Sequence, residues 1–213
     1  MVKPRRPAYA ETDFVKVWFG AMLPIETARL RLRRFVPGDV AALHAIHSRA
    51  DVTRWLFWDP RSEDEVRASI EGHIARPLEQ GAVLAIDLDG TLIGTVNVAV
   101  GESRQGDLGF MLHPDHQGHG YATEAASAML EFAFGSYDLH RVSASVEPRN
   151  AASVRVLERL GMRKEAHLLE NDWVRGEWSS EAIYAIFARE WRERRGRGQL
   201  AFTRPAGHPS QPT

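Results

Sequence analysis

The chain contains no cysteine among its 213 residues. This absence excludes disulfide bonds, thiolate metal ligands and a cysteine nucleophile at once, and it favours a protein of the cytoplasm. Long apolar runs are absent too, since each falls far short of the 18 residues that indicate a membrane-spanning helix. No charged segment leads into an apolar stretch and a small-residue cleavage site, as in a secretory signal. We therefore expect a cytoplasmic protein that has no membrane partner.

A net charge is also nearly absent, because 28 acidic residues balance 27 basic ones and leave a formal charge of −1. Such a chain has no overall field that would recruit nucleic acid, so we expect no nucleic-acid partner. What is present is apolar material, with 44% hydrophobic and 9% aromatic residues. That content is enough to bury the core of one globular domain.

The composition divides the chain into three segments. Residues 1–24 form an N-terminal extension without a clear period, whose apolar stretch 15–23 is a candidate contact in a homodimer. Residues 25–191 carry the periodic patterns of a single domain. Residues 192–213 are rich in Arg, Gly and Pro, and their lack of apolar periodicity predicts a basic, disordered tail.

Within the central segment, strand and helix patterns alternate. Ser62 and Glu65 form a capping box that begins a helix, and Asp89-Gly90 is a strong hairpin signal between two β-rich segments. Asn150 is a suitable N-cap and Gly161 a suitable end for a later helix. The expected strands cover 29–35, 82–88, 91–100, 109–112, 141–146, 163–169 and 181–187, and the expected helices before Asn150 cover 40–48, 63–75 and 123–134.

The most informative stretch is 108–122, an apolar run followed by a loop with Gly118 and Gly120 that opens a helix. The first N–H groups of a helix have no intrahelical acceptor, so this turn is suited to bind phosphate oxygens. Glycine permits a positive φ and a close approach of the main chain. A dinucleotide-binding fold is the nearest alternative, but Thr123 stands where its third glycine belongs, and Asp138 precedes the next strand instead of ending it. The sequence has no P-loop motif.

Gln117-Gly118-His119-Gly120-Tyr121-Ala122 resembles the Gln/Arg-x-x-Gly-x-Gly/Ala loop with which GNAT-type N-acetyltransferases hold the pyrophosphate of acetyl-CoA. About 30 residues later, Asn150-Ala-Ala-Ser153 resembles the second cofactor-contacting segment of that family. The segments 26–33 and 148–153 are similar to the RimJ/RimL branch, whose members acetylate protein N-termini, including those of ribosomal proteins. The resemblance covers roughly residues 25 to 190.

The resemblance implies an α/β (α+β) fold, in which a mixed, mostly antiparallel sheet of about seven strands is splayed into a V and flanked by about four helices. The pantetheine arm of acetyl-CoA would enter where the strands diverge. Main-chain groups of Phe110, Met111 and Leu112 would bond that arm, and the amides of Gln117, Gly118, His119, Gly120, Tyr121 and Ala122 would take the phosphates.

It also implies direct transfer of acetyl to a primary amine in a ternary complex, with a protein N-terminal amine favoured and a small-molecule amine as the alternative. Ser153 would protonate the leaving thiolate, and Asn150 would contact pantetheine. Asp172 or Glu170 would handle the amine. Trp55 and Trp58 lie in the connector that would form one wall of the acceptor cleft, with Trp58 expected to be the more exposed because Asp59-Pro60 follows it.

Structural roles compete with these assignments. Asn150 can act only as a helix cap, Ser153 can bond only backbone, and the tryptophans can pack in the core. His113, His116 and His119 have a spacing that suggests a metal site, but we expect no metal, because their loop faces phosphate on this interpretation. A CoA-binding module without turnover and an enzyme using another acyl-CoA, such as succinyl-CoA, remain alternatives.

Overall fold

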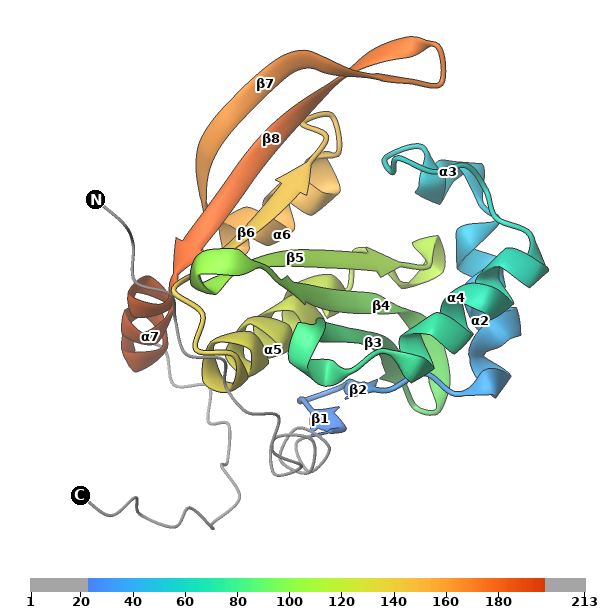
Figure 1. The fold of residues 1–213 in the computed structure, drawn as a ribbon, viewed down its shortest axis with the longest axis horizontal. Helices are drawn as coiled ribbons and strands as arrows, with labels where there is room; N and C mark the ends of the chain where they lie inside the picture. Colours follow the sequence, from blue (N-terminus) through green and yellow to red (C-terminus); the bar gives the residue numbers. More distant parts are fainter. Residues whose placement is uncertain (1–22, 198–213) are drawn as a thin grey trace, which may run out of the picture.

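The computed structural model describes residues 23–197, which form one mixed sheet with helices on both faces (Figure 1). The strands are β1 (Ile25–Glu26), β2 (Arg31–Arg33), β3 (Gly81–Leu88), β4 (Thr91–Val100), β5 (Gln105–Leu112), β6 (Arg141–Val146), β7 (Arg163–Val174) and β8 (Glu177–Phe187). The helices are α2 (Val40–His47), α3 (Ala50–Thr53), α4 (Glu63–Ala75), α5 (Tyr121–Ser136), α6 (Ala151–Arg159) and α7 (Ala188–Arg197). No helix of this part of the chain is long and apolar enough to cross a membrane.

The strand order is β1-β2-β3-β4-β5-β6-β8-β7, and every neighbouring pair is antiparallel except β5 and β6. The parallel pairing of β5 with β6 ends at Asp107 and Ser143. Beyond this point β5 stays with β4 and β6 stays with β8, so the two halves of the sheet diverge (Figure 1). The expected V-shaped mixed sheet is confirmed, with eight strands in the described residues because Ile25–Glu26 adds a short edge strand.

Two apolar clusters cover the two faces of the sheet. Alternate residues point to opposite faces of a strand, so Leu84 and Ile86 of β3 pack in the cluster that includes α5, whereas Ala85 packs in the cluster of α2 and α4. Helix α6 lies on the same face as α5, since Leu157 and Leu160 belong to the first cluster. The face opposite α5 and α6 is therefore covered by α2 and α4 only on the N-terminal half of the sheet (Figure 1).

Local signals position the elements that flank the V. Ser62 Oγ accepts from Glu65 N and the Glu65 carboxylate accepts from Ser62 N at 2.8 Å, which confirms the capping box of α4. The Asp89-Gly90 turn joins β3 and β4 as expected, with both residues at positive φ. Asn150 Oδ1 accepts from Ser153 N at 3.2 Å, and Gly161, at φ +80°, ends α6 as expected.

The expected strand 29–35 is wrong at both ends, since β2 contains only Arg31–Arg33. Thr27 closes a turn instead, with its N–H donating to Leu30 O at 2.9 Å and its Oγ1 accepting from Leu30 N at 2.9 Å. Arg33, the last residue of β2, bonds its guanidinium to Asp39 and Asp87, both buried. These carboxylates raise the pKa of Arg33 and tie the start of α2 to the sheet.

The last two strands are longer than expected and form a hairpin (Figure 1). Strand β7 continues past residue 169 to Val174, and β8 begins before residue 181, at Glu177.

The prediction of a disordered tail from residue 192 is also wrong for residues 192–197, which belong to α7. Trp191 is buried and its Nε1 donates to Glu131 at 2.9 Å, while Arg194 donates to Arg159 O at 2.9 Å. These tertiary contacts hold a segment that has no apolar period of its own. Residues 1–22 and 198–213 lie outside the described part, and with them all but Leu23 of the expected contact at 15–23.

Candidate active site

The V opens along one edge of β5. Residues 108–112 pair with β4 on one side, whereas the pairing with β6 has ended at Asp107. Phe110, Met111 and Leu112 therefore lie on a strand whose second side has no strand partner among the described residues. An open strand edge presents main-chain N–H and C=O groups to a ligand. This open edge is where the resemblance places the pantetheine arm of acetyl-CoA, and that contact stays a prediction.

The glycine loop follows directly at the end of β5. Gly118 has φ +81° and Gly120 has φ +83°, a region that L side chains rarely adopt. A Cβ added at Gly118 would meet nothing within 4 Å, so the loop is open to a ligand there. Gln117 is held by its amide Nε2, which donates to Leu112 O at 3.3 Å. Thr123 Oγ1, in the first turn of α5, is buried and makes no hydrogen bond within the described residues. An orphaned donor beside open amides fits an incoming phosphate.

An ion pair that the sequence analysis missed holds this loop. Arg29, from the turn before β2, donates Nε and Nη2 to Glu124 Oε2 at 2.8 and 2.7 Å, and Nη1 to His119 O at 3.0 Å. The same guanidinium lies 4.6 Å from the centre of the Tyr121 ring. Thr27 Oγ1 donates to Glu124 at 2.7 Å. Arg29 thus joins the edge of the sheet to three residues of the loop and of α5.

Glu124 stays ionised in this network. Burial alone would raise the pKa of its carboxyl, but the hydrogen bonds from Thr27 and Arg29 outweigh burial and lower the pKa. A carboxylate in the first turn of a helix is also favoured by the helix dipole. The only signal in the sequence was an acidic residue in that turn, and nothing there indicated a partner 95 positions away.

Asn150 and Ser153 lie at the start of α6, the helix that covers the same face of the sheet as α5. Asn150 uses its Oδ1 to cap the helix, and Ser153 is half-buried in the first turn. The cap role of Asn150 is therefore present, while a contact with pantetheine stays a prediction. The acid role of Ser153 also stays a prediction.

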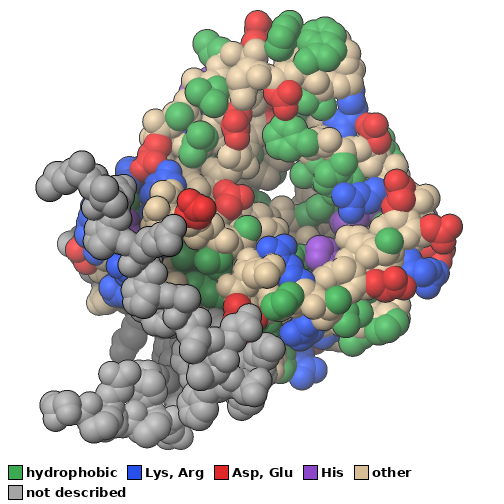
Figure 2. Space-filling view, in the orientation of Figure 1, with side chains coloured by type: hydrophobic (Ala, Val, Ile, Leu, Met, Phe, Trp, Pro, Cys, Tyr) green, Lys and Arg blue, Asp and Glu red, His purple; other side chains and the backbone are tan. Residues whose placement is uncertain are grey.

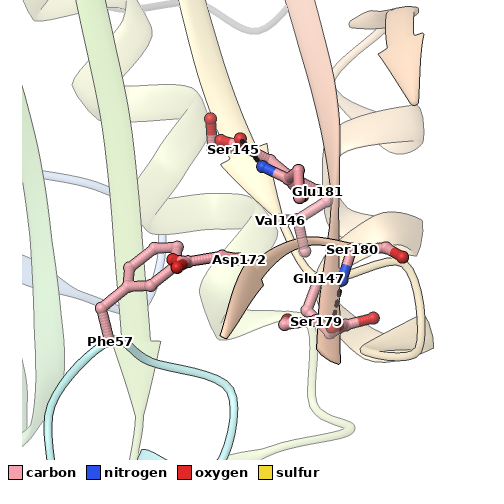
Figure 3. A pocket seen from close by; sticks show the side chains of 9 residues that line it. Phe57, Ser145, Val146, Glu147, Asp172, Ser179, Ser180 and Glu181 are labelled. Atoms are coloured by element: carbon pink, nitrogen blue, oxygen red, sulfur yellow. Dashed lines mark hydrogen bonds between the residues drawn. The ribbon is translucent and has the colours of Figure 1, made fainter. Parts of the chain in front are cut away.

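A pocket opens on the other face, between the loop after α3 and the β7–β8 hairpin. Its walls come from β6, β7, β8 and the loop, namely Phe57, Ser145, Val146, Glu147, Asn171, Asp172, Ser179, Ser180 and Glu181. Figure 3 shows the ring of Phe57 beside Asp172. Glu147, which follows β6, accepts a hydrogen bond from Ser179 of β8. Three of these side chains are carboxylates. The pocket is therefore suited to a positively charged or polar group.

Asp172 and Glu170 are the two residues predicted to handle the amine, and of these Asp172 lines the pocket. It pairs with Ser179 just after an irregularity in the pairing of β7 with β8, between Leu168 and Asp172. Glu170 lies within that irregularity at φ 47°, exposed, and does not line the pocket. Asp172 is thus the better placed of the two carboxylates.

Glu147 is the most strongly held carboxylate of the pocket, and the sequence analysis missed it. It accepts hydrogen bonds from Ser179 Oγ at 2.5 Å, from the amides of Arg149 and Ser180 at 3.1 and 3.3 Å, and from the Arg149 guanidinium. Burial opposes ionisation, but these bonds outweigh it and lower the pKa of Glu147 to about 2. Glu147 therefore fixes the end of β6 to β8 and adds permanent negative charge. Its partner Ser179 lies in a part of β8 that the sequence did not predict.

Asp107 is an exposed residue at the last residue pair before the V opens. The protein around its carboxyl still reduces its solvation, and this desolvation raises its pKa against the opposing effects of Ser143 and Arg141. Glu181, a wall of the pocket, raises the pKa of Asp107 further. A carboxylate with a raised pKa is a stronger base. Asp107 is thus a further candidate for accepting a proton.

The aromatic wall differs from the expectation. Phe57, with 72% of its surface exposed, lines the pocket, whereas Trp55 and Trp58 do not and are half-buried. Trp58 packs against His47, with ring centres 4.8 Å apart, and burial lowers the pKa of His47 to about 4. Trp55 and Trp58 are thus both half-buried, and the expectation that Trp58 is the more exposed of the two stays a prediction.

The three histidines of the loop have separate surroundings. His113 Nδ1 accepts from Asp115 N at 3.3 Å, and the His113 and His116 rings meet edge to face at 6.2 Å. His119 stacks on Tyr121 at 5.7 Å. In the described part of the chain, no group of three or more His, Asp or Glu residues is arranged to hold a metal ion.

Comparison with known proteins matches these features to one family. A model of the acetyltransferase (GNAT) domain matches residues 29–163. The chain is 32% identical to the uncharacterized N-acetyltransferase YnaD of Bacillus subtilis over 169 residues, which are 78% of this chain and 98% of YnaD. It is 27% identical to the spermidine N(1)-acetyltransferase of Vibrio cholerae over 154 residues, 71% of this chain and 88% of that protein.

Solved structures agree with this match. The crystal structure of a GNAT-family acetyltransferase from Bacillus anthracis superposes with a TM-score of 0.72 at 29% identity, covering 78% of this chain and 99% of that one. Mycobacterium smegmatis RimJ in complex with CoA-disulfide superposes with a TM-score of 0.67 at 26% identity, covering 76% and 83% of the two chains.

Arg29 provides a test of the loop. Arg29→Ala removes the bonds to Glu124 and His119, so we expect acetyl-CoA to bind about tenfold more weakly, the effect of losing roughly 1.4 kcal/mol. The maximal rate at saturating acetyl-CoA should stay near that of the wild type. Arg31→Ala is the matched control, since Arg31 lies two positions away and makes an exposed pair with Glu26. Titration calorimetry measures both affinities, and equal affinities for the two variants would contradict the role given to Arg29.

Glu147 predicts a pH dependence of stability. Because its folded-state pKa of about 2 lies below the ordinary 4.5, its stabilising contribution is complete above about pH 5 and is lost as the pH falls toward 2. The wild type should therefore lose its stability advantage over Glu147→Gln across this window. Urea unfolding at several pH values measures the advantage, and Glu177→Gln is the control, since Glu177 makes an exposed contact with the same Arg149. An advantage that stays constant with pH would refute the assignment.

Proposed function

The chain belongs to the GNAT family of acetyltransferases, and on this basis we propose that it transfers acetyl from acetyl-CoA directly to a primary amine in a ternary complex. The catalytic domain is residues 25–191, and the reaction takes place in the cytoplasm. One observation carries the proposal. The V opens at Asp107 and Ser143, with the glycine loop and α6 on one side and the carboxylate-lined pocket on the other. A thioester held along β5 would meet an amine from that pocket.

Main-chain groups and small polar side chains bind acetyl-CoA. Phe110, Met111 and Leu112 offer the open edge of β5 to the pantetheine arm, and the amides of 117–122 take the phosphates, helped by Thr123 Oγ1. Asn150, at the start of α6, contacts the pantetheine arm. Holding the thioester and the amine together converts a bimolecular step into one between neighbours.

Proton transfer divides between the two faces. The amine must lose a proton before or during its attack on the thioester carbonyl, and the CoA thiolate must gain one as the C–S bond breaks. Asp172 at the pocket holds the incoming ammonium by its charge. Asp107, with its raised pKa, accepts the proton. Ser153, on the cofactor side, supplies a proton to the thiolate.

We favour a protein N-terminal amine as the acceptor. The resemblance to the RimJ/RimL branch and the fold shared with RimJ of M. smegmatis support this choice. A polyamine is the second candidate, because Glu147, Asp172 and Glu181 make the pocket acidic and a relative is a spermidine N(1)-acetyltransferase. Both acceptors bring a positive charge to the same carboxylates.

Thiol release from acetyl-CoA measures the proposed reaction directly. We expect release to accelerate with peptides that have a free N-terminus and to stop when the same peptides are N-terminally blocked. Faster release with spermidine would move the assignment to a polyamine acceptor, and faster release from succinyl-CoA would move it to another acyl donor. Binding of acetyl-CoA without release for any amine would contradict the enzyme and support a CoA-binding module.

Three carboxylate variants separate the catalytic roles. Asp107→Asn is expected to lower the maximal rate by a factor of about 100 or more, as for loss of a general base, and Ser153→Ala should lower it in the same direction. Asp172→Asn should mainly raise the KM for the amine, because it removes charge at the pocket. Glu170→Gln, outside the pocket, should leave both constants near the wild type. Steady-state kinetics checks this, and a rate loss for Glu170→Gln larger than that for Asp107→Asn would overturn the assignment.

A further inference from the structure

Arg175 joins the two walls of the acceptor pocket. From the turn between β7 and β8, its Nε donates to Asp59 Oδ1 at 2.7 Å and its Nη2 donates to Leu56 O at 3.0 Å and to Trp58 O. Asp59, Leu56 and Trp58 belong to the loop that follows α3, 116 to 119 positions earlier in the chain. One guanidinium therefore bonds to three acceptors of a loop that is distant in sequence.

The contact closes a ring over the diverging part of the sheet. The β7–β8 hairpin rises from the β6 half, whereas the loop after α3 rises from the half that carries β3, β4 and β5, and the hairpin tip reaches toward that loop (Figure 1). Arg175 at φ 50° and Gly176 at φ 80° form the turn at the tip. Figure 2 shows the surface hollowed between these two walls.

The ring borders the path of the acceptor. A second cavity, lined by Phe57, Asp59, Asp172, Trp173, Val174 and Arg175, lies at the hairpin tip. It shares Phe57 and Asp172 with the pocket described above, so the two cavities are neighbours. A group that approaches Asp172 from the tip must pass beside the contact between Arg175 and Asp59.

The contact between Arg175 and Asp59 is weak, so the border of the acceptor pocket can be changed without unfolding the protein. Asp59 is 80% exposed at its side chain, and an exposed ion pair contributes little to folding stability. The two carbonyl acceptors add geometric definition, since a guanidinium presents its donors in a fixed plane. The contact therefore holds the loop and the hairpin in one arrangement, and its loss would lower the stability of the fold only slightly.

We propose that Arg175 is a specificity-determining residue that narrows the acceptor opening, so that the enzyme accepts an amine at the end of a slender chain and rejects an amine flanked by bulky groups. The proposal rests on the proposed transfer to an amine. It assigns Arg175 no part in the chemical step, because the hydrogen bonds of its guanidinium go to the loop after α3.

The test compares Arg175→Ala with Arg104→Ala. Arg104 is a matched control, since it also has a positive φ and donates to a carboxylate and a main-chain oxygen, those of Asp138, away from the pocket. The acceptors are two peptides that differ only in beginning with Gly-Gly or with Trp-Trp. Arg175→Ala should raise kcat/KM for the bulky peptide by about tenfold, the range that a pocket achieves through size alone. The slender peptide should change by less than about twofold, and Arg175→Lys should fall between wild type and Arg175→Ala.

A second readout does not depend on turnover. Hydrogen exchange of the amides in 54–61 and in 171–178 should become faster together in Arg175→Ala and stay unchanged in Arg104→Ala, while the affinity for acetyl-CoA stays the same. An equal change in kcat/KM for the two peptides, or unchanged hydrogen exchange in both segments, would overturn the inference and leave the proposed function intact. A wild type that binds acetyl-CoA and turns over no amine would overturn the proposed function and the role in specificity with it.

Discussion

The short parallel contact between β5 and β6 is the constraint on which the site depends. It contains three residue pairs, from Gln105 with Arg141 to Asp107 with Ser143. Ser143 Oγ donates to Gly106 O at 3.2 Å at its end. Beyond it each strand keeps its antiparallel partner, and those partners diverge. A longer pairing would occupy the edge of β5 with β6, so that no open strand edge would remain for a cosubstrate arm.

Charged side chains then fix what lies on each side of this opening. Arg29 and Glu124 hold the glycine loop against the sheet, Glu147 and Ser179 join β6 to β8, and Arg175 joins the hairpin to the loop after α3. Several of these groups are exposed, and exposed pairs add little to folding stability. Their effect is better understood as positional, since each one sets the place of a loop that borders the cosubstrate or the acceptor.

The parts of this arrangement that follow from the sequence are those set by local chemistry. The capping box at Ser62, the turn at Asp89-Gly90, the cap at Asn150 and the positive φ of Gly118 and Gly120 each need only a few neighbouring residues. The resemblance of the glycine loop and of the segment at Asn150 then supplied the family and the V-shaped sheet.

The parts that did not follow from the sequence depend on contacts between distant residues. Arg29 and Glu124 are 95 positions apart, and Glu147 and Ser179 are 32 apart. Residues 192–197 became helix because Trp191 is buried against the protein. Phe57 lines the pocket, whereas Trp58 does not, because the Trp58 ring packs against His47 instead.

Amide hydrogen exchange with and without acetyl-CoA tests the central claim most directly, because it reports where the main chain becomes protected. If the open edge of β5 and the glycine loop bind the cosubstrate, exchange should slow in 108–122 and at the start of α6 when acetyl-CoA is saturating. The walls at 54–61 and 171–178 should change less until an amine is added. Protection confined to other segments, or none in 108–122 at saturation, would contradict the account.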